Sequence, residues 1–472
     1  MCGIAGLWGT SDPAPVRRML DVLSHRGPDD SGIYQSPGGA GVLGHRRLSI
    51  MDPQGGHQPI FDRSGARALI ANGEIYNYPQ LRAALAGCYA FSTASDSEAI
   101  LHLYDAHGLD AVRHLEGMYA FAIAEGDQLV LARDPIGIKP LYYGERDGAV
   151  LFASELKALA GQCENVREFP PGACYSSDSG FATFYELPDA PPVDDTAEAY
   201  IAALRATLEW AVGTHLMSDV PLGVFLSGGL DSSIIAALTR RQISKLHSFA
   251  VGVAGSPDLL AARAVARHLG TQHHEYVITA AEVLAALPTI IYHLESFDQD
   301  LVRSAIPCYF TSRLAAQYVK VILTGEGADE LFAGYTYHKR IPDHASLHRE
   351  LRRSITTLHN INLQRVDRMT MAHAIEGRVP FLDLRMIELG QRIPAALKLP
   401  HAQAQEKWIL RKAFEDLLPS EIAWRRKQQF DEGSGAADLL PRVLAGLMSE
   451  EAADAHRHRH PEVYLRSAEE CY

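Results

Sequence analysis

The sequence predicts a sheet-rich α+β domain at the N-terminus, followed by an α/β domain with a parallel sheet and a helical C-terminal part. Three observations predict this. Short apolar runs between turn residues, typical of strands, fill the first 185 residues. Strands and helices alternate further on, which indicates a parallel sheet. A segment rich in proline and aspartate lies between the two regions. A chain of 472 residues suits two to four domains.

The N-terminal domain is predicted to cover residues 1–186. The apolar runs Ala68–Ala71 and Leu129–Leu131 read as strands, and turn residues follow each of them, Asn72-Gly73 after the first. A helix is expected from Ser97 to His107. Residues 187–197 are predicted to be a linker, because the prolines and aspartates in it continue neither a sheet nor a helix.

The C-terminal domain is predicted to cover residues 198–472. It should open with a helix, because apolar residues recur from Ile201 to Ala211 at helical spacing. Strands are expected at 224–226 and 319–323, and a helix at 259–269 that Gly270 ends as a C-terminal cap. From about residue 340 the chain should be mostly helical.

Composition excludes several classes of protein. Hydrophobic residues are 47% and charged residues 21% of the chain, which excludes a disordered, collagen-like or coiled-coil protein. No apolar run approaches the roughly 18 residues of a membrane span. The net charge of −13 argues against a nucleic-acid partner. Six scattered cysteines without a signal peptide predict a cytoplasmic protein with reduced thiols. The alternating histidines of 456–460 are expected to be solvated.

Cys2 is the most informative single residue. If Met1 is removed, the chain begins with a cysteine whose α-amine has a pKa of about 7.7–8. That amine is partly neutral near pH 7 and would take the proton of the thiol, giving an activated nucleophile from one residue.

Five motifs occur in order, and the first of them begins with this cysteine: Cys2–Gly6, His25–Asp29, Arg46–Ile50, Asn72–Asn77 and Ser95–Glu98. Together they resemble the class II glutamine amidotransferases, an N-terminal nucleophile family with an αββα sandwich. The resemblance implies that Cys2 attacks the glutamine amide, and that the Asn72 side chain and the Gly73 N–H stabilise the oxyanion. It also implies that Arg47 binds the glutamine carboxylate, Asp96 its ammonium, and that Glu74 belongs to the same pocket. Arg26 and Asp29 are expected to hold the loop.

A second motif, Ser227–Ser233, follows a predicted strand and opens a helix. Its glycines would let backbone N–H groups approach phosphate oxygens, and the helix N-terminus adds partial positive charge. Asp231 is a candidate magnesium ligand. The motif lacks the Gly-Lys-Ser/Thr ending of a Walker loop and resembles the loop of ATP pyrophosphatases, which split ATP between the α and β phosphates.

Further motifs at 248–252, 256–258, 324–332, 376–383 and 424–430 resemble the synthetase half of glutamine-dependent asparagine synthetases. The resemblance implies that ATP is a substrate and Mg²⁺ a cofactor held by Asp231 and Asp329. Lys427 would neutralise pyrophosphate, and Glu326 would lie beside the reacting acyl group. The nucleotide would be bound by Leu226, Ser227, Gly228, Gly229, Asp231, Ser232, Val251, Thr324 and Gly325.

The two halves together predict one reaction. A small carboxylic acid is converted to an acyl-adenylate, and ammonia released from glutamine, or from a glutamate γ-amide analogue, displaces AMP. An internal passage for ammonia is implied by the family, and a homodimer is expected.

The acceptor segment departs from the family. Asparagine synthetases typically have Thr-Thr where this chain has Asp300-Leu301, ahead of Arg303, and the bacterial members usually continue beyond the point where this chain stops. These departures predict a non-aspartate acceptor from specialised metabolism, on a more open acceptor side. The alternatives are an ordinary asparagine synthetase acting on L-aspartate, and a catalytically silent scaffold or sensor. A β-lactam synthetase is disfavoured, because that family generally lacks the N-terminal cysteine.

Overall fold

The computed structural model describes residues 2–189, 193, 195–400, 405–428, 430–444 and 446–472.

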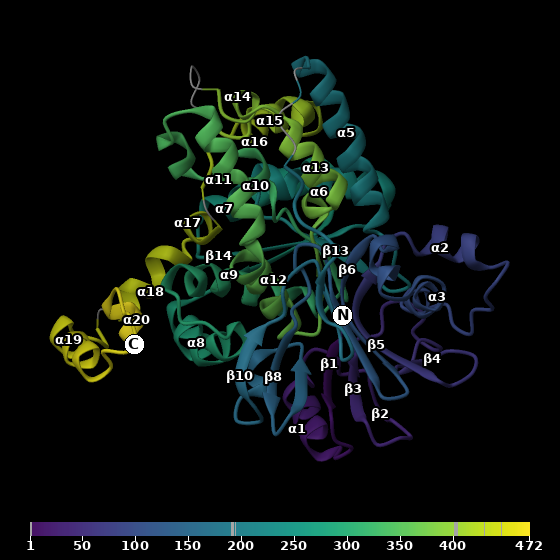
Figure 1. The fold of residues 1–472 in the computed structure, drawn as a ribbon. Helices are drawn as coiled ribbons and strands as arrows, with labels where there is room; N and C mark the ends of the chain where they lie inside the picture. Colours follow the sequence, from purple (N-terminus) through teal and green to yellow (C-terminus); the bar gives the residue numbers. More distant parts are fainter. Residues whose placement is uncertain (1, 190–192, 194, 401–404, 429, 445) are drawn as a thin grey trace.

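Its N-terminal part contains two antiparallel sheets that face each other (Figure 1). The strands of the first sheet, in spatial order, are β10 (Glu164–Glu168), β8 (Tyr142–Arg146), β9 (Ala149–Ala153), β1 (Gly3–Trp8), β3 (Gly41–Arg47) and β2 (Asp30–Gln35). Those of the second are β12 (Gly180–Thr183), β11 (Ala173–Ser176), β7 (Gln128–Arg133), β6 (Gly117–Glu125), β5 (Arg67–Ile75) and β4 (Ile60–Phe61).

The two sheets form the inner layers of a four-layer sandwich. Apolar side chains such as Ile4, Leu43 and Ile70 fill the space between them. Helices α1 (Ala14–Val22) and α4 (Leu156–Leu159) pack on the outer face of the first sheet. Helices α2 (Tyr78–Leu85) and α3 (Glu98–His107) pack on the outer face of the second. The predicted αββα sandwich is therefore confirmed, and so is the helix that ends at His107.

Asn72 and Gly73 lie inside a strand, so the prediction that they form a turn was wrong. Strand β5 continues through both residues and pairs with β6, with Gly73 opposite Tyr119. A Cβ atom at Gly73 would lie 2.0 Å from the carbonyl oxygen of Met118. Glycine is therefore required here by the close approach of two strands, and not by a reversal of the chain.

The C-terminal part is built on a parallel sheet, as predicted. The order of its strands is β15 (Gln272–Val277), β14 (His247–Gly252), β13 (Leu222–Phe225), β16 (Val321–Leu323) and β17 (Glu376–Arg378), and every neighbouring pair is parallel. Helices α6 (Leu230–Gln242) and α7 (Pro257–Leu269) pack with Ala250 on one face. Helices α9 (Gln299–Ala315) and α12 (Asn362–Met371) pack with Val251 on the other. Gly270 caps α7 in the left-handed conformation, as expected.

Helices surround this sheet and make up most of the chain after residue 340. A long helix, α5 (Ala197–Thr214), follows the predicted linker, of which residues 190–192 and 194 lie outside the described residues. The remaining helices are α8 (Ala280–Leu294), α10 (Ala328–Phe332), α11 (His344–Thr356), α13 (Leu384–Arg392), α14 (Ala395–Lys398), α15 (Trp408–Phe414), α16 (Ser420–Ala423), α17 (Phe430–Ser434), α18 (Ala436–Leu444), α19 (Glu450–Arg459) and α20 (Ala468–Cys471).

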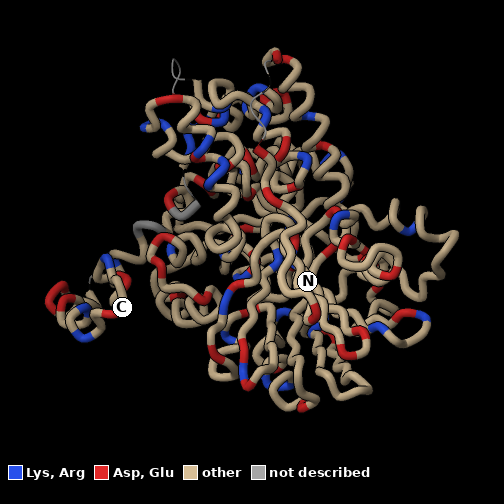
Figure 2. Tube along the Cα trace, viewed as in Figure 1, with Lys and Arg blue, Asp and Glu red and all other residues tan. Residues whose placement is uncertain are grey.

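The C-terminal helices α19 and α20 lie at the edge of the molecule, at the left of Figure 1. The segment 466–470 reaches back to the start of α9, where Arg466 pairs with Asp298 at 2.8 Å. Figure 2 shows acidic and basic residues interspersed along the chain. Within the part of the chain that the structure describes, no helix combines the length and the apolar character that a membrane span requires.

Candidate active sites

Cys2 directly precedes β1, a strand inside the first sheet, and is buried. Its backbone N–H donates to Oδ1 of Asn72 at 2.9 Å, and its carbonyl oxygen accepts from Nε of Arg26 at 3.0 Å. Burial raises the pKa of the thiol, and a hydrogen bond with the Leu48 backbone and the charge of Arg47 oppose this only in part. A thiol in this state needs a base next to it to become a nucleophile. Met1 lies outside the described residues, so release of the α-amine of Cys2 stays a prediction.

Asn72 has an unused hydrogen-bond donor beside the thiol. Its Oδ1 is taken by the Cys2 N–H, whereas its Nδ2 is buried and has no partner among the described residues. A buried amide donor without a partner costs about 1–3 kcal/mol, so its retention points to a ligand that it serves. This geometry fits the predicted role of Asn72 as a donor to an oxyanion.

Arg47 and Asp96 do not pair with each other. Among the ion pairs of the described residues none joins Arg47 to a carboxylate; its guanidinium donates to the backbone carbonyls of residues 51–53, at 2.7 Å for Asp52. Asp96 is buried and accepts from the Ile75 N–H at 2.6 Å. Burial raises the pKa of Asp96 to about 6. A cation and a carboxylate are thus held separately, as recognition of a zwitterionic amino acid requires.

Glu74 faces the C-terminal domain. Its Oε1 lies 3.5 Å from Nη2 of Arg378, and its Oε2 is buried without a partner among the described residues. Burial raises the pKa of Glu74 well above its usual value, and the carboxylates of Glu376 and Asp96 raise it further. Its predicted place in the glutamine pocket stays a prediction, but its contact with Arg378 makes it part of the domain interface.

A cavity of about 590 Å³ opens at the carboxyl ends of the parallel strands. This is the edge where α/β sheets bind ligands. Every predicted nucleotide-binding residue except Gly228 lines it. Gly228 instead lets the loop pack on α7, because a Cβ there would lie 2.4 Å from the Ala262 nitrogen and the backbone has a φ of +72°. Within the loop, Ser227 Oγ lies 3.1 Å from Ser232 Oγ.

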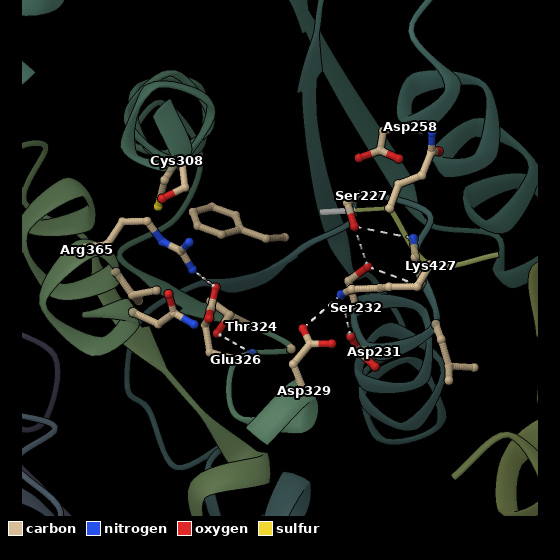
Figure 3. A pocket seen from close by; sticks show the side chains of 18 of the residues that line it. Ser227, Asp231, Ser232, Asp258, Cys308, Thr324, Glu326, Asp329, Arg365 and Lys427 are labelled. Atoms are coloured by element: carbon tan, nitrogen blue, oxygen red, sulfur yellow. Dashed lines mark hydrogen bonds and ion pairs between the residues drawn. The ribbon is translucent and has the colours of Figure 1, made fainter. Parts of the chain in front are cut away.

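Two aspartates and two lysines meet at the centre of the cavity. Lys407 Nζ lies 2.6 Å from both Asp231 Oδ2 and Asp329 Oδ1, and Lys427 Nζ lies 2.8 Å from Asp329 Oδ2. Although burial lowers it, the two carboxylates raise the pKa of Lys427 above its usual value. Figure 3 shows Asp329 between the Lys427 end of the cavity and the Glu326 end.

The residues at the centre also fit a magnesium ion. Among the described residues no three His, Cys, Asp or Glu side chains are arranged as a metal cage. Mg²⁺ in phosphate-binding sites, however, usually takes one or two carboxylates and completes its shell with phosphate oxygens and water. Asp231 Oδ1 is buried without a hydrogen-bond partner among the described residues, so an unused ligand atom is present.

At the other end of the cavity, Glu326 pairs with Arg365 of α12, and Cys308 of α9 lies nearby (Figure 3). Asp300 and Leu301 line the cavity as predicted. Arg303 is not among the lining residues: Glu469 of the C-terminal segment holds it through two hydrogen bonds, at 2.9 and 2.5 Å. The expectation that Arg303 faces the acceptor therefore does not match this geometry.

The charge at Asp300 is also weaker than the sequence suggested. Its side chain is 74% exposed, and Arg466 lies 3.9 Å away. Water screens such a carboxylate strongly, so it repels an acidic acceptor less than a partly buried one would. Leu301 is buried, so its apolar branch takes part in the shape of the cavity. We therefore expect Leu301 to affect acceptor binding more than the exposed Asp300 does.

Sequence reasoning missed Lys407 and Arg365. Neither residue belongs to a phosphate or metal motif, and each reaches the cavity from a helical region far along the chain. No local pattern in the sequence marks them; the need for a counter-charge beyond Lys427 becomes visible only once the structure brings Asp231 and Asp329 together.

Comparisons with known proteins agree with this two-site architecture. A family model described as "Glutamine amidotransferase domain" matches residues 1–177, and one described as "Asparagine synthase" matches residues 203–343 and 338–472. The glutamine-hydrolysing asparagine synthetase B of Escherichia coli (strain K12) is 41% identical, over 98% of this chain and 88% of that protein.

Two further matches are more partial. The glutamine-hydrolysing asparagine synthetase of Triphysaria versicolor is 42% identical, over 92% of this chain and 78% of its own. A solved allosteric regulatory enzyme of purine biosynthesis matches 51% of this chain and 63% of its own at 25% identity, with a TM-score of 0.37, too distant to bear on the site. By the family models and the near full-length relatives, the chain belongs to the glutamine-hydrolysing asparagine synthetase family, whose members are carbon–nitrogen ligases that take their amide nitrogen from glutamine.

Proposed function

We propose that this protein activates a carboxylic acid with ATP and amidates it with ammonia released from glutamine, and that L-aspartate is its acceptor. One observation carries the proposal: a single chain pairs a buried thiol, beside an unpaired amide donor, with a cavity whose two carboxylates are held by lysines. Relatives named asparagine synthetases support aspartate as the acceptor.

The N-terminal site would release ammonia through a thioester. The Cys2 sulfur bonds to the side-chain carbonyl carbon of glutamine, and its proton passes to the α-amine of Cys2. The carbonyl oxygen becomes an oxyanion that accepts from Nδ2 of Asn72. Collapse of this intermediate breaks the carbon–nitrogen bond and returns the proton to the departing ammonia. Water then hydrolyses the thioester to glutamate.

The C-terminal site would form and use an acyl-adenylate. A carboxylate oxygen of the acceptor attacks the α-phosphorus of ATP, and pyrophosphate leaves. Lys407 and Lys427 lie where they would stabilise the charge on the departing phosphates. Ammonia then attacks the acyl carbon, AMP leaves, and Glu326 takes a proton from the new amide nitrogen.

Asp231 and Asp329 would hold magnesium in this site. When bound, Mg²⁺ supplies positive charge to the β- and γ-phosphates. With ATP bound, the positive charge of the magnesium ion would balance the aspartates, and the phosphates would offer negative charge to the lysines. Lys407 and Lys427 would then contact the phosphates as well as Asp231 and Asp329.

An acceptor screen tests the proposal. The protein is incubated with ATP, glutamine or ammonia, and one candidate acid at a time, and AMP, pyrophosphate and amide are measured together. We expect aspartate to give the three products in equal amounts. A different acid with a higher kcat/KM would overturn aspartate as the acceptor, and the absence of AMP with every acid would favour a silent scaffold.

We expect the KM for glutamine to rise as the pH falls through about 6. Burial raises the pKa of Asp96 to about 6, so its carboxylate is ionised above that pH and attracts the ammonium of glutamine. Below it the carboxylate is protonated, and the KM should rise about tenfold per pH unit. Glutamate release measured from pH 5 to 8 checks this. Asp96→Asn should give a high KM that does not change over this range; a wild-type KM independent of pH contradicts the assignment.

A second acceptor class is favoured by the shape of the cavity. The buried Leu301 lines its acceptor end, Arg303 is turned to Glu469, and Arg365 is already paired with Glu326. These contacts leave less positive charge for a second acceptor carboxylate and more apolar surface. They favour a less acidic or more apolar acid. The named relatives, which are asparagine synthetases, give no support for an acceptor from specialised metabolism.

The double change Asp300→Thr with Leu301→Thr tests this second candidate. If it is right, kcat/KM for aspartate should improve by about tenfold, since one misplaced branch in a pocket is worth about 1–3 kcal/mol. Because Asp300 is exposed, Leu301→Thr alone should give most of the gain and Asp300→Thr alone little. Efficient asparagine formation by the wild type at submillimolar aspartate, with no gain in the variants, would reject the second candidate.

A further inference from the structure

Arg26 joins the backbone of Cys2 to the C-terminal domain. Its Nε donates to the Cys2 carbonyl oxygen at 3.0 Å, and its two terminal nitrogens donate to the two carboxylate oxygens of Asp367, at 2.8 and 3.1 Å. Arg26 is completely buried and Asp367 is 4% exposed. The sequence predicted that Arg26 holds its own loop; its partner across the domain interface was not expected.

The geometry of the guanidinium makes this contact directional. A bidentate pair with Asp367 fixes the plane of the guanidinium, and Glu155 accepts from Nη1 at 2.6 Å on the side of the N-terminal domain. Because the plane of the guanidinium is fixed, the direction of the Nε–H bond is fixed as well, and it is directed at the Cys2 carbonyl oxygen. The position of the Cys2 backbone therefore depends on a carboxylate that belongs to the other domain.

Helix α12 contacts both sites. Arg365 lines the synthetase cavity and pairs with Glu326, and Asp367 follows two residues later. At 3.6 residues per turn, two residues are separated by about 200° around the helix axis. One face of the helix thus carries Arg365 toward the cavity, and the opposite face carries Asp367 toward Arg26, which bonds the Cys2 backbone.

We propose that Asp367 is a positioning residue for glutamine hydrolysis, acting through Arg26 to hold the Cys2 thiol in line with the Asn72 donor. This rests on the proposed function, because it gives Cys2 the attack on glutamine. Asp367 touches neither the thiol nor glutamine. Its loss should move the thiol without removing it, and a displacement of about 1 Å costs about 100-fold in rate.

The test uses Asp367→Asn in the full-length protein. The amide keeps the size of the side chain but loses its charge and one acceptor oxygen. Three quantities are measured: the rate at which a glutamine analogue with an electrophilic γ-carbon alkylates Cys2, the kcat and KM of glutamine hydrolysis, and product formation with ammonia. We expect alkylation and kcat to fall about 10- to 100-fold. The KM for glutamine and the ammonia-dependent rate should change by less than about twofold, because Arg47, Asp96 and the synthetase cavity are untouched.

The matched control is Glu168→Gln, at the same domain interface. Glu168 pairs with Arg133 at 2.8 Å and, across the interface, with His359 at 2.7 Å, and no contact between Glu168 and either Arg26 or Asp367 is present among the described residues. It should alkylate at the wild-type rate. If it is slowed as much as Asp367→Asn, the effect is a general loosening of the interface and the proposal is overturned. A wild-type alkylation rate in Asp367→Asn overturns it as well.

Arg26→Lys keeps the test decisive if Asp367→Asn does not fold. Lysine retains the charge but lacks the planar fork that bonds Asp367 twice while Nε reaches Cys2, so alkylation should slow in this variant too. Alkylation needs neither ATP nor acceptor. A wild-type protein that is alkylated at Cys2 but forms no amide would therefore count against the proposed function and not against the role of Asp367.

Discussion

Cys2→Ala is expected to abolish glutamine-dependent product formation, by roughly a thousandfold or more, and to leave ammonia-dependent formation largely intact. The thiol is needed only to release nitrogen, and the cavity that activates the acceptor is built from the other half of the chain. The measurement is the rate of amide formation with glutamine and with an ammonium salt, in the same preparation and at a pH where free ammonia is abundant.

Cys88→Ala is the matched control for this experiment. Cys88 is exposed and lies outside both sites, so both rates should stay at the wild-type level. Loss of both activities in Cys2→Ala, at unchanged stability, would contradict the model of two separate sites.

Asp231→Asn should remove acyl-adenylate formation and spare glutamine hydrolysis. The carboxylate lies 2.6 Å from Lys407 and has a further oxygen without a partner among the described residues, so it is the best placed magnesium ligand. An amide is a much weaker ligand and leaves the charge of Lys407 less balanced. Exchange of labelled pyrophosphate into ATP, measured with acceptor present, should fall below detection.

Asp300→Asn serves as the control, because it makes the same acid-to-amide change at the far end of the same cavity. Asp300 is mostly exposed and has no lysine within ion-pair distance among the described residues, so exchange should change by less than about threefold. Undiminished conversion of ATP to AMP in Asp231→Asn would mean that Asp231 is not a metal ligand.

Some parts of the sites that the sequence predicted are contiguous or belong to one strand, whereas distant residues such as Asp329 and Lys427 were placed only by the family resemblance. The loop from Ser227 to Ser232 joins one strand to one helix, so its residue types and its geometry are determined together. Asn72 is placed by strand β5, which pairs along its whole length with β6. Local patterns of this kind are visible in a sequence because the backbone alone brings the residues together.

Other parts depend on packing between distant segments, which no local pattern encodes. Lys407 precedes a short helix, yet its ammonium reaches two aspartates that lie far earlier in the chain. Arg303 is turned from the cavity by Glu469, on a terminal segment that folds back onto α9. Asp300 lies exposed in the first turn of α9, so the sequence overstated its charge effect.

The charged contacts across the domain interface have a consequence for how the two halves of the molecule are held together. Arg26 and Glu74 are buried on one side, and each has a partner of opposite charge on the other, Asp367 and Arg378, in addition to the pair that Arg26 makes with Glu155 of its own domain. Separating the halves would break these pairs and expose their charged groups to water, so the contacts favour the docked arrangement of the two halves. The charged contacts that support Cys2 therefore also fix how the two chemistries are placed relative to each other.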